Sequence, residues 1–126
     1  QINKRNFDLI HLQGEIQTFA CKYGLSDLES YRLQICVEEM IYELMNGCFA
    51  NNNNINIDVD ISYYENDASC RMKFTCKGKK FNPFDENLQQ NDDENLEHLG
   101  LAIIKGKSKT YNYIFHDDIN EVDIEL

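Results

Sequence analysis

Two alternations of apolar and polar residues in the middle of the chain predict a β-hairpin. Between 55 and 63 the odd-numbered residues are Ile, Val or Tyr and the even-numbered ones are Asn, Asp or Ser, the period-2 pattern of a strand with one buried face. Between 70 and 77 a second alternation places Cys, Met, Phe and Cys on one face and Arg, Lys, Thr and Lys on the other. The turn-forming residues 65–67 separate the two runs, so we expect them to pair antiparallel.

Helical periodicity predicts two helices before this hairpin. The first runs over 7–23 and ends at Gly24. Its expected core face consists of Phe7, Ile10, His11, Gly14, Phe19 and Ala20. The second begins with a capping box, in which the Ser26 hydroxyl accepts from the Glu29 amide and the Glu29 carboxylate reaches back, and it ends at Gly47. Its apolar stripe consists of Leu33, Val37, Met40, Ile41, Leu44 and Cys48.

The remaining pattern completes an α+β chain. Residues 83–97 hold six acidic residues, no basic residue and no glycine, which predicts a solvated loop that includes a short helical turn. We then expect a short helix at 99–104 and two strands, 110–116 and 121–126, around a turn at 117–120. This order favours a two-layer sandwich with the helices on one face of a mixed, mostly antiparallel sheet.

Composition narrows the class of protein. A chain of 126 residues is long enough for one core, so we expect a single domain over 1–126, which can be a fragment of a longer protein. Acidic residues exceed basic ones by ten, which disfavours a nucleic-acid partner. The five cysteines lack metal-site spacing, so we expect reduced thiols and a cytoplasmic location. No apolar run approaches the roughly 20 residues that span a membrane.

Two carboxylates on the second predicted helix are candidates for chemistry. Glu39 and Glu43 are four residues apart, so their Cβ atoms lie about 6 Å apart on one helix face and a single ligand could meet both. The alternative is a pair of solvated surface carboxylates. Spacing alone does not decide between these interpretations.

Three segments together resemble motifs of the ATP-binding superfamily that includes gyrase, histidine kinases, and mismatch-repair and chaperone ATPases (the GHKL or Bergerat fold). They are EMIYE (39–43), CKGKKFNP (76–83) and HLGL (98–101). The chain resembles most closely the compact branch of bacterial anti-sigma-factor serine kinases. The resemblance runs from about residue 7 to 126, and the opening edge strand of such domains would have to lie within 1–6.

The resemblance implies roles for the first two segments. Glu39 corresponds to the general base that acts on a water or a serine hydroxyl, and Glu43 stands where the family has an Asn that ligates Mg²⁺. Cys76 replaces the Asp that accepts from the adenine amino group, and Gly78 and Phe81 follow it in the nucleotide site. A thiol is a poor acceptor, and the alternation predicts that Cys76 is a small buried hydrophobic residue.

The third segment corresponds to the phosphate-binding helix start of the family. His98 replaces a glycine there, while Gly100 and Lys105 match the pattern and could contact an anion. The alternatives are that His98 is an exposed or capping side chain and that Lys105, with Lys107 and Lys109, is a solvated helix end. The acidic residues of 83–97 would oppose a triphosphate.

These observations support two functional hypotheses and a third of another class. The first is a regulatory serine/threonine kinase-like domain that uses ATP and Mg²⁺, with weakened or lost catalysis and a sigma-factor-like or antagonist-like protein partner. The second is a non-catalytic protein-binding or sensor module that keeps the fold without nucleotide binding. The third is a purely structural strand-pairing module. The oligomeric state stays open, a homodimer included.

Overall fold

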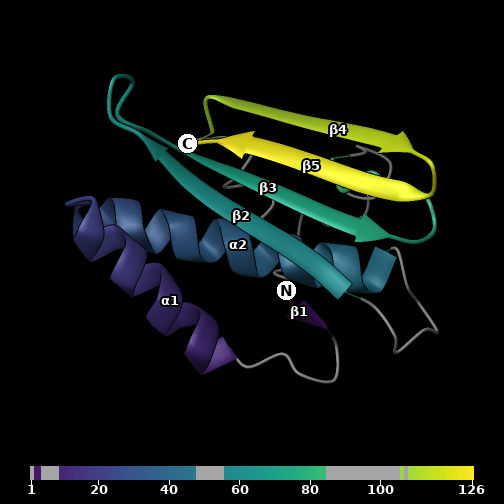
Figure 1. Cartoon of the computed structure of the whole chain (residues 1–126), viewed down its shortest axis with the longest axis horizontal. Coiled ribbons are helices and arrows are strands. Elements are labelled where there is room, and N and C mark those ends of the chain that lie inside the picture. The colour runs from purple at the N-terminus through teal and green to yellow at the C-terminus, as the bar shows by residue number, and fades with distance from the viewer. Residues whose placement is uncertain (1, 4–8, 48–55, 85–105, 107) are drawn as a thin grey trace.

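The fold is a two-layer α+β sandwich, with both helices on one face of a five-stranded sheet (Figure 1). The computed structural model describes residues 2–3, 9–47, 56–84, 106 and 108–126. Its elements are β1 (Ile2–Asn3), α1 (Leu9–Lys22), α2 (Asp27–Gly47), β2 (Asn56–Tyr64), β3 (Ser69–Lys77), β4 (Thr110–His116) and β5 (Ile119–Glu125). The strand order is β1-β2-β3-β5-β4, and every pairing among these strands is antiparallel. The predicted fold class is confirmed.

The central hairpin forms with the predicted facing. Its register pairs Tyr64 with Ser69 and Ile57 with Cys76. Alternate side chains of β3 are buried against the helices, and those between them are exposed or half-buried on the outer face. Ile2 and Asn3 pair with Ile57 and Asn56 at the start of β2, so a short edge strand does lie within 1–6.

Helix α2 begins where the capping box predicts. The Glu29 amide donates to Ser26 Oγ at 3.1 Å, a type of contact that contributes about 1 kcal/mol to helix stability. Leu33, Val37, Met40, Ile41 and Leu44 of the predicted stripe are buried together with residues of β3 and β5 in one core cluster. Cys48, the last residue of that stripe, lies outside the described residues. Full burial of each large apolar side chain contributes roughly 1.5–3 kcal/mol, so this helix-to-sheet contact is the main source of stability.

The predicted core face of α1 is confirmed only in part. Ile10 is 80% exposed, and His11 and Gly14 are exposed as well. The buried side chains of α1 are Leu12, Ile16 and Ala20, of which only Ala20 was predicted. The predicted Phe19 is half-buried against the core, and Phe7 lies outside the described residues. The three buried residues are spaced four residues apart, so they form the row that faces α2.

The last two strands form a tight hairpin. β4 has the predicted bounds, but β5 begins at Ile119 rather than 121, and the turn contains only Asp117 and Asp118. Both have positive φ, 51° and 62°, as a two-residue type I′ turn requires. Asn120, expected in the turn, is therefore a strand residue.

Candidate functional site

The two candidate carboxylates lie on α2 at different depths. Glu43 is 5% exposed, so it is not a solvated surface carboxylate. Glu39 is half-buried, and its Oε1 is inaccessible to solvent. Both side chains therefore face protein rather than bulk water, where electrostatic interactions with a charged ligand are stronger than on an open surface.

The segment after β3 packs onto the same side of α2. Glu39, Glu43 and Gly47 are spaced by four residues, so they follow one another along one face of the helix. A Cβ atom at Gly47 would overlap the ring of Phe81. Glycine is needed here because it lets the ring lie directly on the helix backbone. Sequence analysis assigned the segments 39–43 and 78–81 to one site. In the structure, Phe81 of the second segment packs on the helix face that also carries Glu39 and Glu43 of the first.

Asn120 holds the segment after β3 in place. Its side chain is fully buried, and its Oδ1 accepts from the Phe81 amide at 3.0 Å and from the Tyr113 hydroxyl at 2.5 Å. Its Nδ2 donates to the Lys79 carbonyl at 3.0 Å. The Gly78 amide also donates to the carbonyl of the β4–β5 turn residue Asp118, at 2.9 Å. The nucleotide-site candidates Gly78 and Phe81 are therefore positioned by the last hairpin.

Cys76 lies in the core between α2 and the sheet. It is 3% exposed and belongs to the same buried cluster as Met40 and Leu44 of α2. In the sheet it pairs with Ile57 on one side and Asn120 on the other. The thiol is a weak hydrogen-bond acceptor, so this position does not reproduce the carboxylate that the family places beside adenine.

The third motif cannot be placed with the others. His98, Gly100 and Lys105 lie outside the described residues, as do the acidic stretch from 85 to 97 and the expected helix at 99–104. Lys109 is described, and it lines a cavity of about 180 Å³ with Leu25, Glu29 and Arg32. That cavity is near the start of α2, about 27 Å along the helix from Gly47.

Sequence analysis missed two residues that organise this region, Asn120 and Gly47 in its contact with Phe81. A signal for Asn120 was present, because it alternates with Val122 and Ile124 and so occupies a core position of a strand. A polar residue at such a position must be hydrogen-bonded to be tolerated. Gly47 carried no comparable signal, since its role depends on a residue 34 positions later.

Among the candidate site residues that the structure describes, Glu43 fits Mg²⁺, but Cys76 does not fit the adenine amino group. No group of three or more His, Cys, Asp or Glu side chains in the described ranges is arranged to hold a metal ion. Magnesium in nucleotide sites commonly takes one or two protein carboxylates and completes its shell with phosphate and water, which Glu43 could satisfy. Cys76 supplies no comparable group for the adenine amino group.

Comparison with known proteins identifies the class of fold. No protein-family model matches the sequence, and no curated protein matches it. The structure is similar to the histidine kinase domain of a blue-light-activated histidine kinase from Erythrobacter litoralis, with a TM-score of 0.54 and 14% sequence identity. The match covers 77% of this chain and 46% of that one, so the chain spans about half the length of its structural neighbour. The chain therefore has the histidine-kinase-like ATPase fold.

The helices were also compared with the requirements of a membrane span. Neither α1 nor α2, nor any other helical stretch in the described part of the chain, is both long and apolar enough to cross a bilayer.

Proposed function

We propose that this chain is a regulatory ATP-binding domain of the anti-sigma-factor kinase type, with weakened or lost phosphoryl transfer. The observation that carries the proposal is the packing of Phe81 on Gly47. It brings the 78–81 segment to the side of α2 that also presents Glu39 and Glu43. The histidine-kinase-like fold supports the same location for a nucleotide.

The proposal assigns roles to residues of this chain. Glu39 is the general base and Glu43 the ligand for Mg²⁺, which when bound neutralises phosphate charge. The base of the nucleotide lies toward Cys76, Gly78 and Phe81. The phosphates lie toward the 98–105 segment, at the residues named for it above: His98, Gly100 and Lys105.

Weakened catalysis follows from the chemistry of the substituted positions. A second carboxylate at Glu43 lies one turn from Glu39 and adds negative charge where the triphosphate would bind. Cys76 leaves the adenine amino group without a strong acceptor, and unsatisfied polar groups are costly in a site that excludes water. Both side chains are buried, Glu43 at 5% and Cys76 at 3% exposure.

A non-catalytic protein-binding or sensor module is the second candidate. The observation that favours it is the engagement of Asn120, whose amide group already bonds Phe81, Tyr113 and Lys79 beside the buried Cys76. In either case the partner is a regulatory protein of the sigma-factor or antagonist class.

Calorimetric titration of ATP and ADP, with and without Mg²⁺, tests the proposal. Weak magnesium-dependent binding by the native chain, strengthened about tenfold or more in Cys76→Asp, is the expected result. Cys21→Asp is the matched control, because Cys21 is exposed on α1. Circular dichroism must show that Cys76→Asp is folded. If it is not, Glu39→Gln replaces it, with retained ATP binding and abolished phosphoryl transfer expected.

Absence of binding by the native chain and by a folded Cys76→Asp variant would refute nucleotide binding and leave the protein-binding module. Binding by the native chain that Cys76→Asp does not change would refute the role of Cys76 alone.

A further inference from the structure

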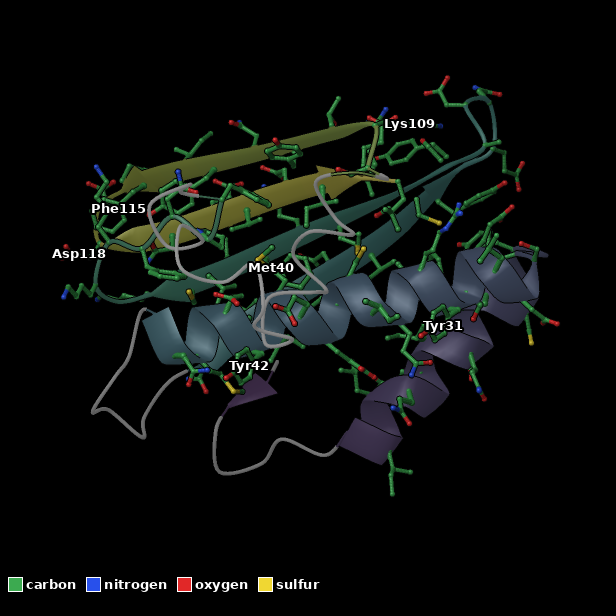
Figure 2. All side chains as sticks on the ribbon, turned by 180° about the vertical axis from the view of Figure 1, so that it is seen from behind. Tyr31, Met40, Tyr42, Lys109, Phe115 and Asp118 are labelled. Carbon is green, nitrogen blue, oxygen red and sulfur yellow. The ribbon has the colours of Figure 1, made fainter. Side chains whose placement is uncertain are left out.

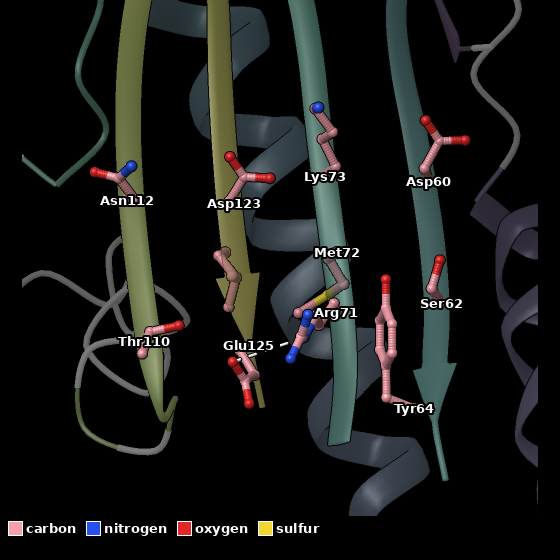
Figure 3. A pocket seen from close by; sticks show the side chains of 11 residues that line it. Asp60, Ser62, Tyr64, Arg71, Met72, Lys73, Thr110, Asn112, Asp123 and Glu125 are labelled. Atoms are coloured by element: carbon pink, nitrogen blue, oxygen red, sulfur yellow. Dashed lines mark ion pairs between the residues drawn. The ribbon is translucent and has the colours of Figure 1, made fainter. Parts of the chain in front are cut away.

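Helix α2 is apolar on two opposite faces. Leu33, Val37, Met40 and Leu44 are buried against the sheet. Successive residues of a helix are about 100° apart, which places Leu28, Tyr31, Ile35 and Tyr42 within an arc of about 60° on the opposite side. Figure 2 shows Tyr31 and Tyr42 on the side of α2 away from the sheet, whereas Met40 lies between helix and sheet. We call these four residues the outer stripe.

The outer stripe is open in the isolated chain. Tyr31 is 60% exposed, Leu28 56% and Tyr42 45%, while Ile35 is half-buried. Helix α1 reaches the edge of the stripe, where Gln13 bonds Glu38, but it leaves Leu28, Tyr31 and Tyr42 exposed. A helix on the surface of a domain normally presents polar residues to water. Four apolar residues along about 21 Å of helix therefore indicate a docking surface.

The negative charge of α2 and of the whole chain indicates which kind of partner the outer stripe would bind. Helix α2 carries five carboxylates and a single basic residue, Arg32. A second copy of α2 would bring the same negative charge to the contact, and the whole chain has a net charge of −10. Like charges disfavour self-association, whereas a basic partner is attracted. We propose that the outer stripe docks an amphipathic helix of a partner protein, with apolar residues along one face and Lys or Arg beside them.

Glu38, at the edge of the outer stripe, is held in place as a hydrogen-bond acceptor for such a partner. Glu38 Oε1 accepts from Gln13 Nε2 of α1 at 3.0 Å and from Gln34 Nε2 at 3.1 Å. These contacts hold the carboxylate in one place next to Tyr31 and Ile35, so a partner cation would lose less freedom on meeting it. About 14 residues of partner helix would cover the stripe.

This surface lies beside the nucleotide site on α2, since Ile35 is one helical turn from Glu39. None of its four residues belongs to the set that the proposed function assigns to ATP or Mg²⁺. Calorimetry with ATP on Tyr31→Gln is expected to match the native chain, so failure of one proposal leaves the other standing.

Fluorescence anisotropy with a labelled synthetic peptide tests the docking proposal. The probe is an amphipathic helix of about 18 residues with Leu along one face and Lys beside it, and the control peptide has Glu in place of every Lys. We expect the Lys peptide alone to bind, more weakly at high salt. Leu28→Gln and Tyr31→Gln each raise its dissociation constant about tenfold. Ile114→Gln, at an exposed apolar residue of β4, leaves it unchanged.

Three results would overturn the docking proposal. The first is equal binding of both peptides or of neither, and the second is an equal loss in Ile114→Gln. The third is evidence of another occupant. A dimer in sedimentation velocity that Tyr31→Gln dissociates would assign the stripe to a second copy. A lower free energy of unfolding in Tyr31→Gln would assign it to a segment of the chain itself.

Discussion

The ring of Phe81 lies where a side chain on Gly47 would have to be. The contact joins the end of α2 to the segment after β3, so it both closes the core and shapes the candidate site. A glycine at this position allows a close approach that any larger residue would prevent.

Gly47→Ala is expected to destabilise the protein by about 1–3 kcal/mol, because the added methyl group overlaps Phe81 and forces it to move. Urea denaturation measures the loss. Gly14→Ala is the matched control, since a Cβ there meets nothing within 4 Å and alanine favours a helix by up to about 1 kcal/mol. Equal effects of the two changes would show that the Phe81 contact is not tight.

Asn120→Ala is expected to cost about 2–4 kcal/mol, because it removes the donor to the Lys79 carbonyl and one of the two acceptors of the Phe81 amide, which also donates to the Tyr113 hydroxyl. Hydrogen exchange at the Phe81 amide should accelerate in this variant, while exchange at the centre of α2 changes less. Tyr113→Phe removes only one hydroxyl from the same network, and about 1 kcal/mol is expected. A loss in Asn120→Ala no larger than that in Tyr113→Phe would contradict the central role of Asn120.

The buried thiol of Cys36 makes the free energy of unfolding depend on pH in the alkaline range. Burial raises the pKa of its thiol from 9.0 to about 12. Below pH 9 the thiol is protonated in both states, and its contribution is fully present. Between pH 9 and 12 the unfolded chain releases a proton that the native chain keeps, so the free energy of unfolding falls by about 1.4 kcal/mol per pH unit.

Urea denaturation at several pH values between 9 and 10.5 measures this slope. Cys36→Ala is the control, because it removes the thiol and retains the other groups that titrate in this range. The native chain should lose stability more steeply than the variant. Parallel curves would contradict the effect of burial on Cys36.

Two substitutions at Asp118, in the β4–β5 turn, are expected to change the stability of the protein in opposite directions. Asp118 has a φ of 62°, which glycine adopts without the steric cost that a Cβ brings. Asp118→Gly should therefore stabilise the protein by up to about 1 kcal/mol. Asp118→Ala should destabilise it, because alanine lacks the tolerance of Asp for this region. Thermal unfolding of both variants is the measurement, and a change of the same sign in both would argue against a strained turn.

Local signals in the sequence were sufficient to predict most of the described elements. Alternation predicted β2 and β3 with their buried faces, and the capping box predicted the start of α2, because each depends on residues close together in the chain. The candidate carboxylates Glu39 and Glu43 were proposed from their spacing together with the family resemblance. Their different burial was not, since it depends on what packs against the helix.

The sequence by itself thus determined the order of the described helices and strands, the antiparallel pairing of the central hairpin and the class of fold, all of which rest on short-range periodicity. Only the tertiary structure decided which face of α1 is buried, that Asn120 holds Phe81, and that Gly47 receives its ring. It also showed that the outer stripe of α2 stays exposed, while the stripe predicted from periodicity meets the sheet. These features join residues that are distant in the chain, and their energies arise from packing and buried hydrogen bonds that exist only once the layers have assembled.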